Sequence, residues 1–155
     1  MNDLQPLKTL LEQAERERDA ALAEHQRVLA ASRAAQAQSE ELLTYRREYE
    51  KRWTEQFKTE GKMELVRCYH EFMNRLTSAV EGQARAVQQA AAHADRAGNA
   101  LRQQEIRCAS VRKLIERRVH GLRADEERRD QKQSDEFASR LAWGRANASD
   151  QTPAV

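Results

Sequence analysis

The sequence predicts an all-α protein, a long two-helix antiparallel coiled-coil hairpin with an overhanging C-terminal helix. Three observations predict this fold. Of 155 residues, 39% are hydrophobic and 34% charged, with five glycines and two prolines, which is typical of long helices and not of a thick globular core. Apolar residues recur at alternating spacings of three and four, which argues against the competing interpretation of disorder. One plausible break, at residues 58–62 (KTEGK), separates two such patterns.

The first helix is expected over residues 4–58. Asp3 suits the N-cap position, and Pro6 falls in the first turn, where backbone N–H groups have no helical partner. The pattern forms a heptad seam of modest quality, because several members are small or polar. Its two rows are Leu4, Leu11, Arg18, His25, Ser32, Ser39, Arg46 and Trp53, and Leu7, Ala14, Ala21, Val28, Ala35, Leu42 and Tyr49.

The second helix is expected from about Met63 to about residue 142, after a turn at residues 59–62. Its glycines Gly82, Gly98 and Gly121 each weaken a helix by about 1 kcal/mol relative to alanine. An extra residue near 76–80 resembles a stutter. The seam residues are Leu65, Tyr69, Phe72, Leu76, Val80, Gln83, Val87, Ala90, Ala94, Ala97, Leu101, Gln104, Cys108, Val111, Ile115, Arg118 and Leu122.

Pairing the two helices tests the hairpin on the sequence alone. If the chain reverses between residues 60 and 61, facing residues have numbers that add to about 121, and small residues then face small residues along the length. Beyond about Arg118 the second helix has no partner segment. Residues 144–155 are expected to form a disordered tail, so residues 1–143 are predicted to be a single coiled-coil domain.

Several function classes are not supported by the residues. Gln56 stands where a phosphate-binding GxxxxGK loop needs its first glycine, and the four histidines lack cysteines at metal-ligand spacing. No catalytic residues, metal or cofactor are therefore expected. A net charge of +2 does not favour nucleic-acid binding, and no apolar run of about 18 residues predicts a transmembrane helix. The N-terminus also lacks the layout of a signal peptide.

The two cysteines, Cys68 and Cys108, are expected to be reduced thiols in the core of a cytosolic protein. They lie in one helical pattern at a spacing that places them roughly 60 Å apart at ~1.5 Å per residue. A disulfide needs Cα atoms within about 7 Å, so the two cannot pair within one chain.

Aromatic residues concentrate around the turn. Six of the eight lie between residues 38 and 83: Tyr45, Tyr49, Trp53, Phe57, Tyr69 and Phe72. One interpretation is that they only seal the hairpin. The alternative is that a two-helix coiled coil is too thin to bury them fully, which leaves exposed aromatic surface that can anchor a partner.

Three stretches together resemble one family. They are residues 45–49 (YRREY), residues 69–76 (YHEFMNRL) and, most specifically, residues 130–138 (DQKQSDEFA). Their order and spacing resemble the flagellar export protein FliJ, and the resemblance spans residues 4–142. It implies a non-catalytic, stalk-like antiparallel coiled coil of flagellar type III protein export. It also implies a cytoplasmic protein, peripherally associated with the inner membrane at the flagellar base.

The resemblance implies partners as well as a fold. They are the hexameric export ATPase, whose assembly and activity such proteins promote, the cytoplasmic domain of the export-gate membrane protein, and export chaperones. The gate-binding surface of the family carries over to Gln38, Leu42, Tyr45, Tyr49, Phe72, Leu76, Ala79 and Gln83. An ATPase or chaperone contact carries over to the C-terminal motif of Asp130, Gln131, Lys132, Asp135, Glu136 and Phe137.

Under the pairing rule, the eight gate-surface residues form four facing pairs: 38 with 83, 42 with 79, 45 with 76 and 49 with 72. They therefore form one strip across both helices, ~17 Å long at ~1.5 Å per residue. Two other functions stay open at this point. One is the corresponding stalk of a virulence injectisome, which is less expected to carry an ending like DQKQSDEFA. The other is an unrelated coiled-coil tether.

Overall fold

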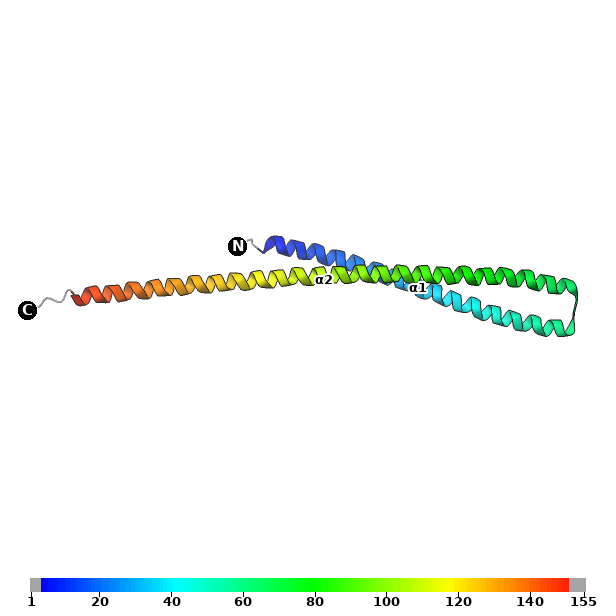
Figure 1. Ribbon diagram of the computed structural model, residues 1–155. Coiled ribbons are helices and arrows are strands. Elements are labelled where there is room, and N and C mark those ends of the chain that lie inside the picture. Colours follow the sequence, from blue (N-terminus) through cyan, green and yellow to red (C-terminus); the bar gives the residue numbers. More distant parts are fainter. Residues whose placement is uncertain (1–3, 151–155) are drawn as a thin grey trace, which may run out of the picture. The chain divides into compact units, whose positions relative to one another are not determined.

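Two helices make up nearly all of the computed structural model, which describes residues 4–150. They are α1, Gln5–Thr59, and α2, Met63–Asp150 (Figure 1). No strand occurs between residues 4 and 150, so the predicted all-α class is confirmed, and both ends of α1 lie within one residue of the prediction. Pro6 is the second residue of α1, and the expected N-cap, Asp3, lies outside the described residues.

The chain reverses between the helices at residues 60–62. The Lys62 carbonyl accepts hydrogen bonds from the N–H groups of Leu65 (3.1 Å) and Val66 (3.3 Å), which starts α2. Gly61 does not adopt a positive φ, and a Cβ added there would meet nothing within 4 Å. The reversal therefore does not require the backbone freedom of glycine, although the glycine does mark where the two helical patterns separate.

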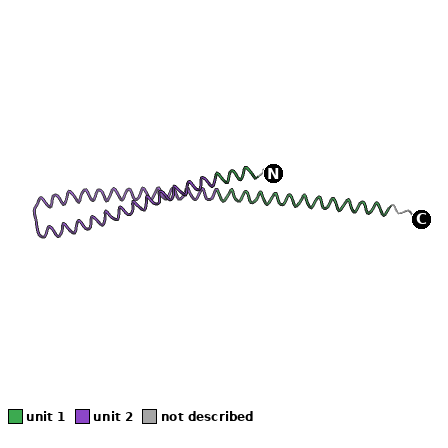
Figure 2. The backbone as a smooth tube through the Cα atoms, turned by 180° about the vertical axis from the view of Figure 1, so that it is seen from behind, with its two compact units in different colours: residues 1–13, 108–155 green, residues 14–107 purple. Residues whose placement is uncertain are grey.

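Two compact units divide the chain. One comprises residues 14–107, and the other comprises residues 1–13 and 108–155 (Figure 2). In the 14–107 unit, the α1 and α2 segments lie side by side and run in opposite directions, as cross-helix contacts of Glu17 with Arg107 and of Tyr49 with Phe72 require. The sequence-based expectation of a single domain over residues 1–143 stays a prediction.

The predicted heptad seam is the buried face of both helices. Every seam residue predicted in α1 is buried or half-buried, and so is every one predicted in α2 except Arg118, which is exposed. The buried apolar residues are few and mostly small: Ala14, Leu76, Ala94, Cys108 and Val111. Each helix contributes only one buried face to a two-helix contact, so the core is a thin line of side chains along that contact.

The register in the 14–107 unit follows the pairing rule near the turn. Gln38 contacts Gln83 and Tyr49 contacts Phe72, as expected. Farther from the turn, His25 lies against Gly98, a shift of a few residues from the expected facing position. An extra residue in α2 near 76–80 moves higher-numbered α2 residues opposite a given α1 residue, which agrees with the observed shift.

Two glycines of α2 differ in what surrounds them, which gives a testable contrast. At Gly121 an added Cβ would meet nothing within 4 Å, whereas at Gly98 it would lie 3.3 Å from His25 Nε2. Gly121→Ala should raise the free energy of unfolding by about 0.5–1 kcal/mol, because alanine loses less backbone entropy in a helix. Gly98→Ala should gain less, because the His25 ring must move. Urea unfolding followed by circular dichroism measures both, and equal gains would contradict the contrast.

Two expectations need correction. The α2 helix does not end near residue 142 but continues to Asp150, so residues 144–150 are helical and not part of a disordered tail. Alanine and arginine in this stretch favour helix, and one glycine, Gly144, does not end it. Cys108 is buried, with 1% of its surface exposed, but Cys68 is exposed. Cys68 lies outside the heptad seam, whereas Cys108 is a seam residue.

Candidate functional site

Six aromatic rings form one connected cluster at the turn end of the 14–107 unit, here called the aromatic ladder. Its members are Tyr45, Tyr49, Trp53 and Phe57 of α1 and Tyr69 and Phe72 of α2. The α1 members are spaced by four residues, which places them on one face of the helix. Successive ring centroids along α1 are 5.6, 6.1 and 5.5 Å apart.

The rings of α2 lie between those of α1. Phe72 lies 4.1 Å from Tyr49 and 6.5 Å from Tyr45, measured between ring centroids. Tyr69 lies 5.5 Å from Trp53 and 5.3 Å from Phe57. Tilted and edge-on pairs at these separations contribute about 0.5–1.5 kcal/mol each beyond the burial of their area. The ladder therefore holds the two helices together next to the turn.

Exposure separates one ring from the others. Five members of the ladder are half-buried, whereas Tyr45, at the end away from the turn, is 45% exposed. The interpretation that the aromatics seal the hairpin thus fits five of the six rings. Tyr45 has one side against Tyr49 and Phe72 and presents the rest of its ring to solvent, where a partner can reach it.

The eight residues predicted as a strip are spread between core and surface. Gln83 Nε2 donates to the Ala35 carbonyl (3.0 Å) and to Gln38 Oε1 (3.4 Å), so two of the four predicted pairs, 38 with 83 and 49 with 72, are in contact. Three of the eight are exposed, namely Gln38, Tyr45 and Ala79. Leu76 is 7% exposed and belongs to the core. The outward part of the strip is therefore centred on Tyr45.

A groove beside Tyr45 contains residues that the sequence interpretation did not select. It has a volume of about 460 Å³ and is lined by Ala37, Glu40, Glu41, Thr44, Tyr45 and Glu48. Helical spacing from Tyr45 places Glu41 one turn before it and Glu48 one turn after it on the same face. That spacing was readable in the sequence, but nothing there distinguished these glutamates from the many others on solvated helix faces.

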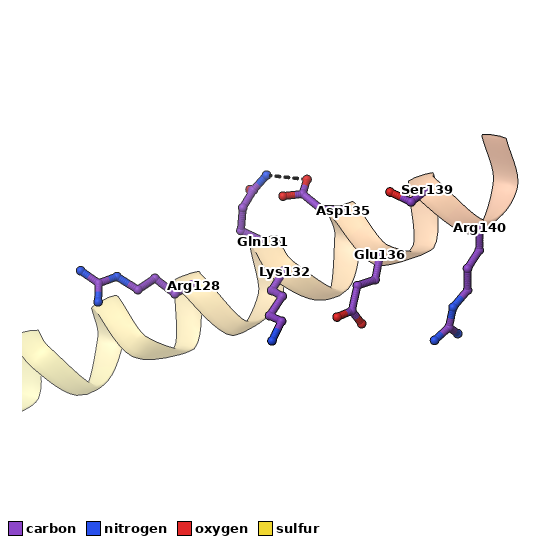
Figure 3. Close-up of a pocket in the computed structure, with 7 residues that line it drawn as sticks. All are labelled: Arg128, Gln131, Lys132, Asp135, Glu136, Ser139 and Arg140. Carbon is purple, nitrogen blue, oxygen red and sulfur yellow. Dashed lines mark hydrogen bonds between the residues drawn. The ribbon is translucent and has the colours of Figure 1, made fainter. Parts of the chain in front are cut away.

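The C-terminal motif lies on α2 in the other unit, where all six of its predicted residues are exposed. Gln131 Nε2 donates to Asp135 Oδ1 at 3.2 Å (Figure 3), and Phe137 is 65% exposed. A groove of about 600 Å³ is lined by Arg128, Gln131, Lys132, Asp135, Glu136, Ser139 and Arg140. Because all seven come from one helix, this is an open surface groove between side chains. The groove offers charges of both signs to a partner, and Phe137 adds an exposed aromatic ring on the same helix.

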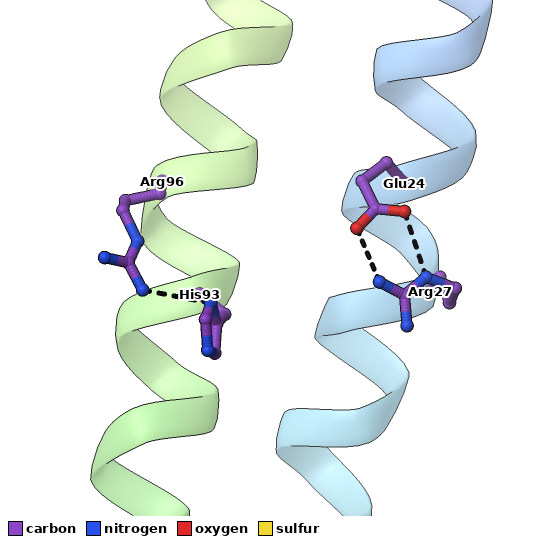
Figure 4. Close-up of polar contacts among 4 residues, drawn as sticks. All are labelled: Glu24, Arg27, His93 and Arg96. Atoms are coloured by element: carbon purple, nitrogen blue, oxygen red, sulfur yellow. Dashed lines mark hydrogen bonds and ion pairs between the residues drawn. The ribbon is translucent and has the colours of Figure 1, made fainter.

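A third groove lies between α1 and α2 within the 14–107 unit, with a volume of about 690 Å³. Arg27 donates to both Glu24 carboxylate oxygens, at 2.9 and 2.5 Å, and across the groove Arg96 Nη2 lies 3.0 Å from His93 Nδ1 (Figure 4). The hydrogen bond from Arg27 lowers the pKa of the Glu24 carboxyl and raises that of the Arg27 guanidinium. Both groups are exposed, so this pair orients side chains more than it stabilises the fold.

Two other kinds of site are absent from residues 4–150. No group of three or more His, Cys, Asp or Glu side chains there is arranged to hold a metal ion. None of the helices in that range is long and apolar enough to cross a membrane. One buried acceptor, Gln104 Oε1, has no hydrogen-bond partner among the described residues, and it lies in the helix seam.

The comparisons with known proteins give one match. A family model described as "Flagellar FliJ protein" matches residues 3–147. The matched range includes the aromatic ladder, the eight-residue strip and the C-terminal motif. No curated protein and no solved structure matches the chain significantly.

Proposed function

The chain belongs to the FliJ family of flagellar proteins, and from this membership we propose that it is a non-catalytic, stalk-like component of flagellar type III protein export. In this role it binds the hexameric export ATPase and promotes its assembly and activity. It also contacts the cytoplasmic domain of the export-gate membrane protein and the export chaperones. The family match over residues 3–147 is the observation that carries the proposal.

The gate contact is assigned to the eight-residue strip. Its support is Tyr45, an aromatic side chain that is 45% exposed beside a seam whose aromatic members in α1, Tyr49 and Trp53, are half-buried. Exposed aromatic residues surrounded by a well-packed scaffold are the side chains that contribute most to protein interfaces. The rest of the aromatic ladder fixes the position of Tyr45, so the surface is preorganised before a partner arrives.

The ATPase or chaperone contact is assigned to the C-terminal motif. Its support is the run of exposed α2 residues from 125 to 150, which includes Phe137 at 65% and Trp143 at 72% exposure. A helix with isolated aromatic residues among charges can dock its apolar side chains into a groove of another protein. The charges around them add orientation and salt dependence to such a contact.

The proposed location is the cytoplasmic side of the inner membrane at the flagellar base. The chain is held there through its partners, since the export gate is a membrane protein in this family's system. An injectisome stalk is the less favoured alternative, because the matching family model is the flagellar one. Because the chain belongs to this family, the alternative function of an unrelated coiled-coil tether is no longer favoured.

A reconstitution with purified components tests this proposal. Adding the chain to the flagellar export ATPase should raise its hydrolysis rate about threefold, equivalent to ~0.7 kcal/mol of barrier. The immobilised gate domain should bind the chain with a Kd of about 1–10 µM, as expected of a small transient interface. A chain with Tyr45→Ala should keep the ATPase effect, because the two contacts use different surfaces. Absence of both interactions at low salt would overturn the proposal.

A further inference from the structure

The exposed ring of Tyr45 is flanked by carboxylates on its own helix. Glu41 lies four residues before it and Glu48 three residues after it, and both line the same groove of about 460 Å³. Glu40 and Thr44 complete the polar rim of that groove. The groove contains no basic side chain, although α1 as a whole carries many. A tyrosine ring that is 45% exposed, with a glutamate one helical turn away on either side, is therefore presented to solvent.

Within residues 4–150, the two flanking carboxylates are unpaired, unlike two other acidic groups of the 14–107 unit. Glu17 pairs with Arg107 and Glu24 pairs with Arg27, whereas neither Glu41 nor Glu48 forms an ion pair or hydrogen bond among the described residues. Their negative charges therefore stay available to a partner.

The nearest basic side chains do not form ion pairs with these carboxylates. Arg47 Nε donates to the Leu43 carbonyl (3.4 Å), and Arg46 is a half-buried seam residue. Arg52 is exposed one turn beyond Glu48 but makes no ion pair with it. The groove beside Tyr45 is therefore lined by three glutamates and no basic side chain, and the basic residues Arg46, Arg47, Lys51 and Arg52 lie outside it.

The chemistry of this surface selects a cation. A guanidinium or ammonium group is attracted to the face of a tyrosine ring within about 6 Å of its centroid. Arginine fits better than lysine, because its planar group stacks on a ring and reaches carboxylates with several N–H donors at once. A neutral or acidic partner would instead leave two glutamates unpaired at the contact or add like-charge repulsion.

We propose that Tyr45, Glu41 and Glu48 form a docking surface for an arginine-bearing basic segment of the export-gate domain. The arginine lies on the Tyr45 ring, and its N–H groups bind the two carboxylates. This inference rests on the proposed function, because it names the kind of segment that the gate presents at the strip. Phe72 and Tyr49 contribute by holding the Tyr45 ring from behind.

The test measures binding of the purified gate domain to the full chain with both Glu41→Gln and Glu48→Gln. These changes keep side-chain size and remove two charges, so affinity should fall about tenfold, or 1.4 kcal/mol. The dependence of log Kd on log salt should also become shallower, because fewer opposite charges meet. The matched control carries Glu50→Gln and Glu55→Gln, which remove two exposed charges of α1 outside the groove, and should bind like the wild type.

The outcomes separate this inference from the proposed function. If the wild-type chain does not bind the gate domain, the gate contact itself is wrong. If the wild type binds, Tyr45→Ala weakens it, and the Glu41→Gln, Glu48→Gln chain matches the wild type in affinity and salt dependence, the function stands and this inference is wrong. Sedimentation of the chain alone tests a second copy as the occupant. Self-association that is lost in the double variant would also overturn the gate segment as the occupant.

Discussion

Replacing Leu76 by alanine should lower the free energy of unfolding by about 2–4 kcal/mol, because the change removes buried methyl groups and leaves a cavity. Leu76 is 7% exposed, and it is larger than the other buried residues of the 14–107 unit, which are alanines. A thin core has few such residues, so few neighbouring contacts remain to compensate for the packing that the substitution removes. Urea unfolding followed by circular dichroism at a helical wavelength measures the change.

Leu141→Ala is the matched control for this prediction. It is the same chemical change on the same helix, but Leu141 is 49% exposed, so less apolar surface is lost from the folded state. The expected change in the free energy of unfolding is within about 0.5 kcal/mol, as for other surface substitutions. Similar losses at the two positions would mean that Leu76 is not the main packing residue that its burial indicates.

Replacing Tyr45 by alanine should weaken binding to the export-gate domain about thirtyfold, equivalent to ~2 kcal/mol, the size typical of a central aromatic anchor. The same change should lower the free energy of unfolding by only about 1 kcal/mol. Tyr45 is 45% exposed and its removal leaves the close pair of Tyr49 and Phe72, 4.1 Å apart, in place. Calorimetry or surface plasmon resonance measures the affinity, and urea unfolding measures the stability.

Two controls define what the Tyr45 result means. Tyr45→Phe keeps the ring and its contacts with Tyr49 and Phe72, so it should retain most of the affinity. Leu22→Ala removes an apolar side chain of similar exposure, 40%, from the same helix but far from the strip, and should leave binding unchanged. If Tyr45→Ala binds the export-gate domain with wild-type affinity while the contact of Phe72 with Tyr49 is kept, the strip belongs to the core and is not an interface.

Much of the fold could be predicted because one periodic signal determines it. A spacing of three and four residues identifies the buried face of a helix wherever the helix is long, and nearly every predicted seam residue of α1 and α2 is indeed buried or half-buried. The turn could be predicted because residues 58–62 interrupt both patterns. The pairing of Tyr49 with Phe72 then followed from counting outward from the turn.

Other features could not be predicted, for physical reasons. The degree of exposure of each half-buried residue depends on where its side chain points across the helix contact, which periodicity does not give. The seam includes Leu76 and not Tyr45, so it did separate the buried residue of the strip from the exposed one. Composition did not show that α2 continues to Asp150, since helix formers and turn formers are mixed there. The sequence also did not show which glutamates beside Tyr45 remain unpaired, because side-chain geometry decides that.

The position of the aromatic ladder next to the turn has a consequence for how the 14–107 unit folds. Gln38 and Gln83, just beyond the ladder, are separated by 45 residues, and Glu17 and Arg107 by 90. Each doubling of a closed loop adds about 0.6 kcal/mol of chain entropy cost, so contacts near the turn are the least costly to form first. The ladder places its strongest ring contacts where that cost is lowest. We therefore expect the helices to associate first at the turn and then progressively away from it. The ring contacts should be formed in the transition state for folding, and the Glu17–Arg107 pair should form after it.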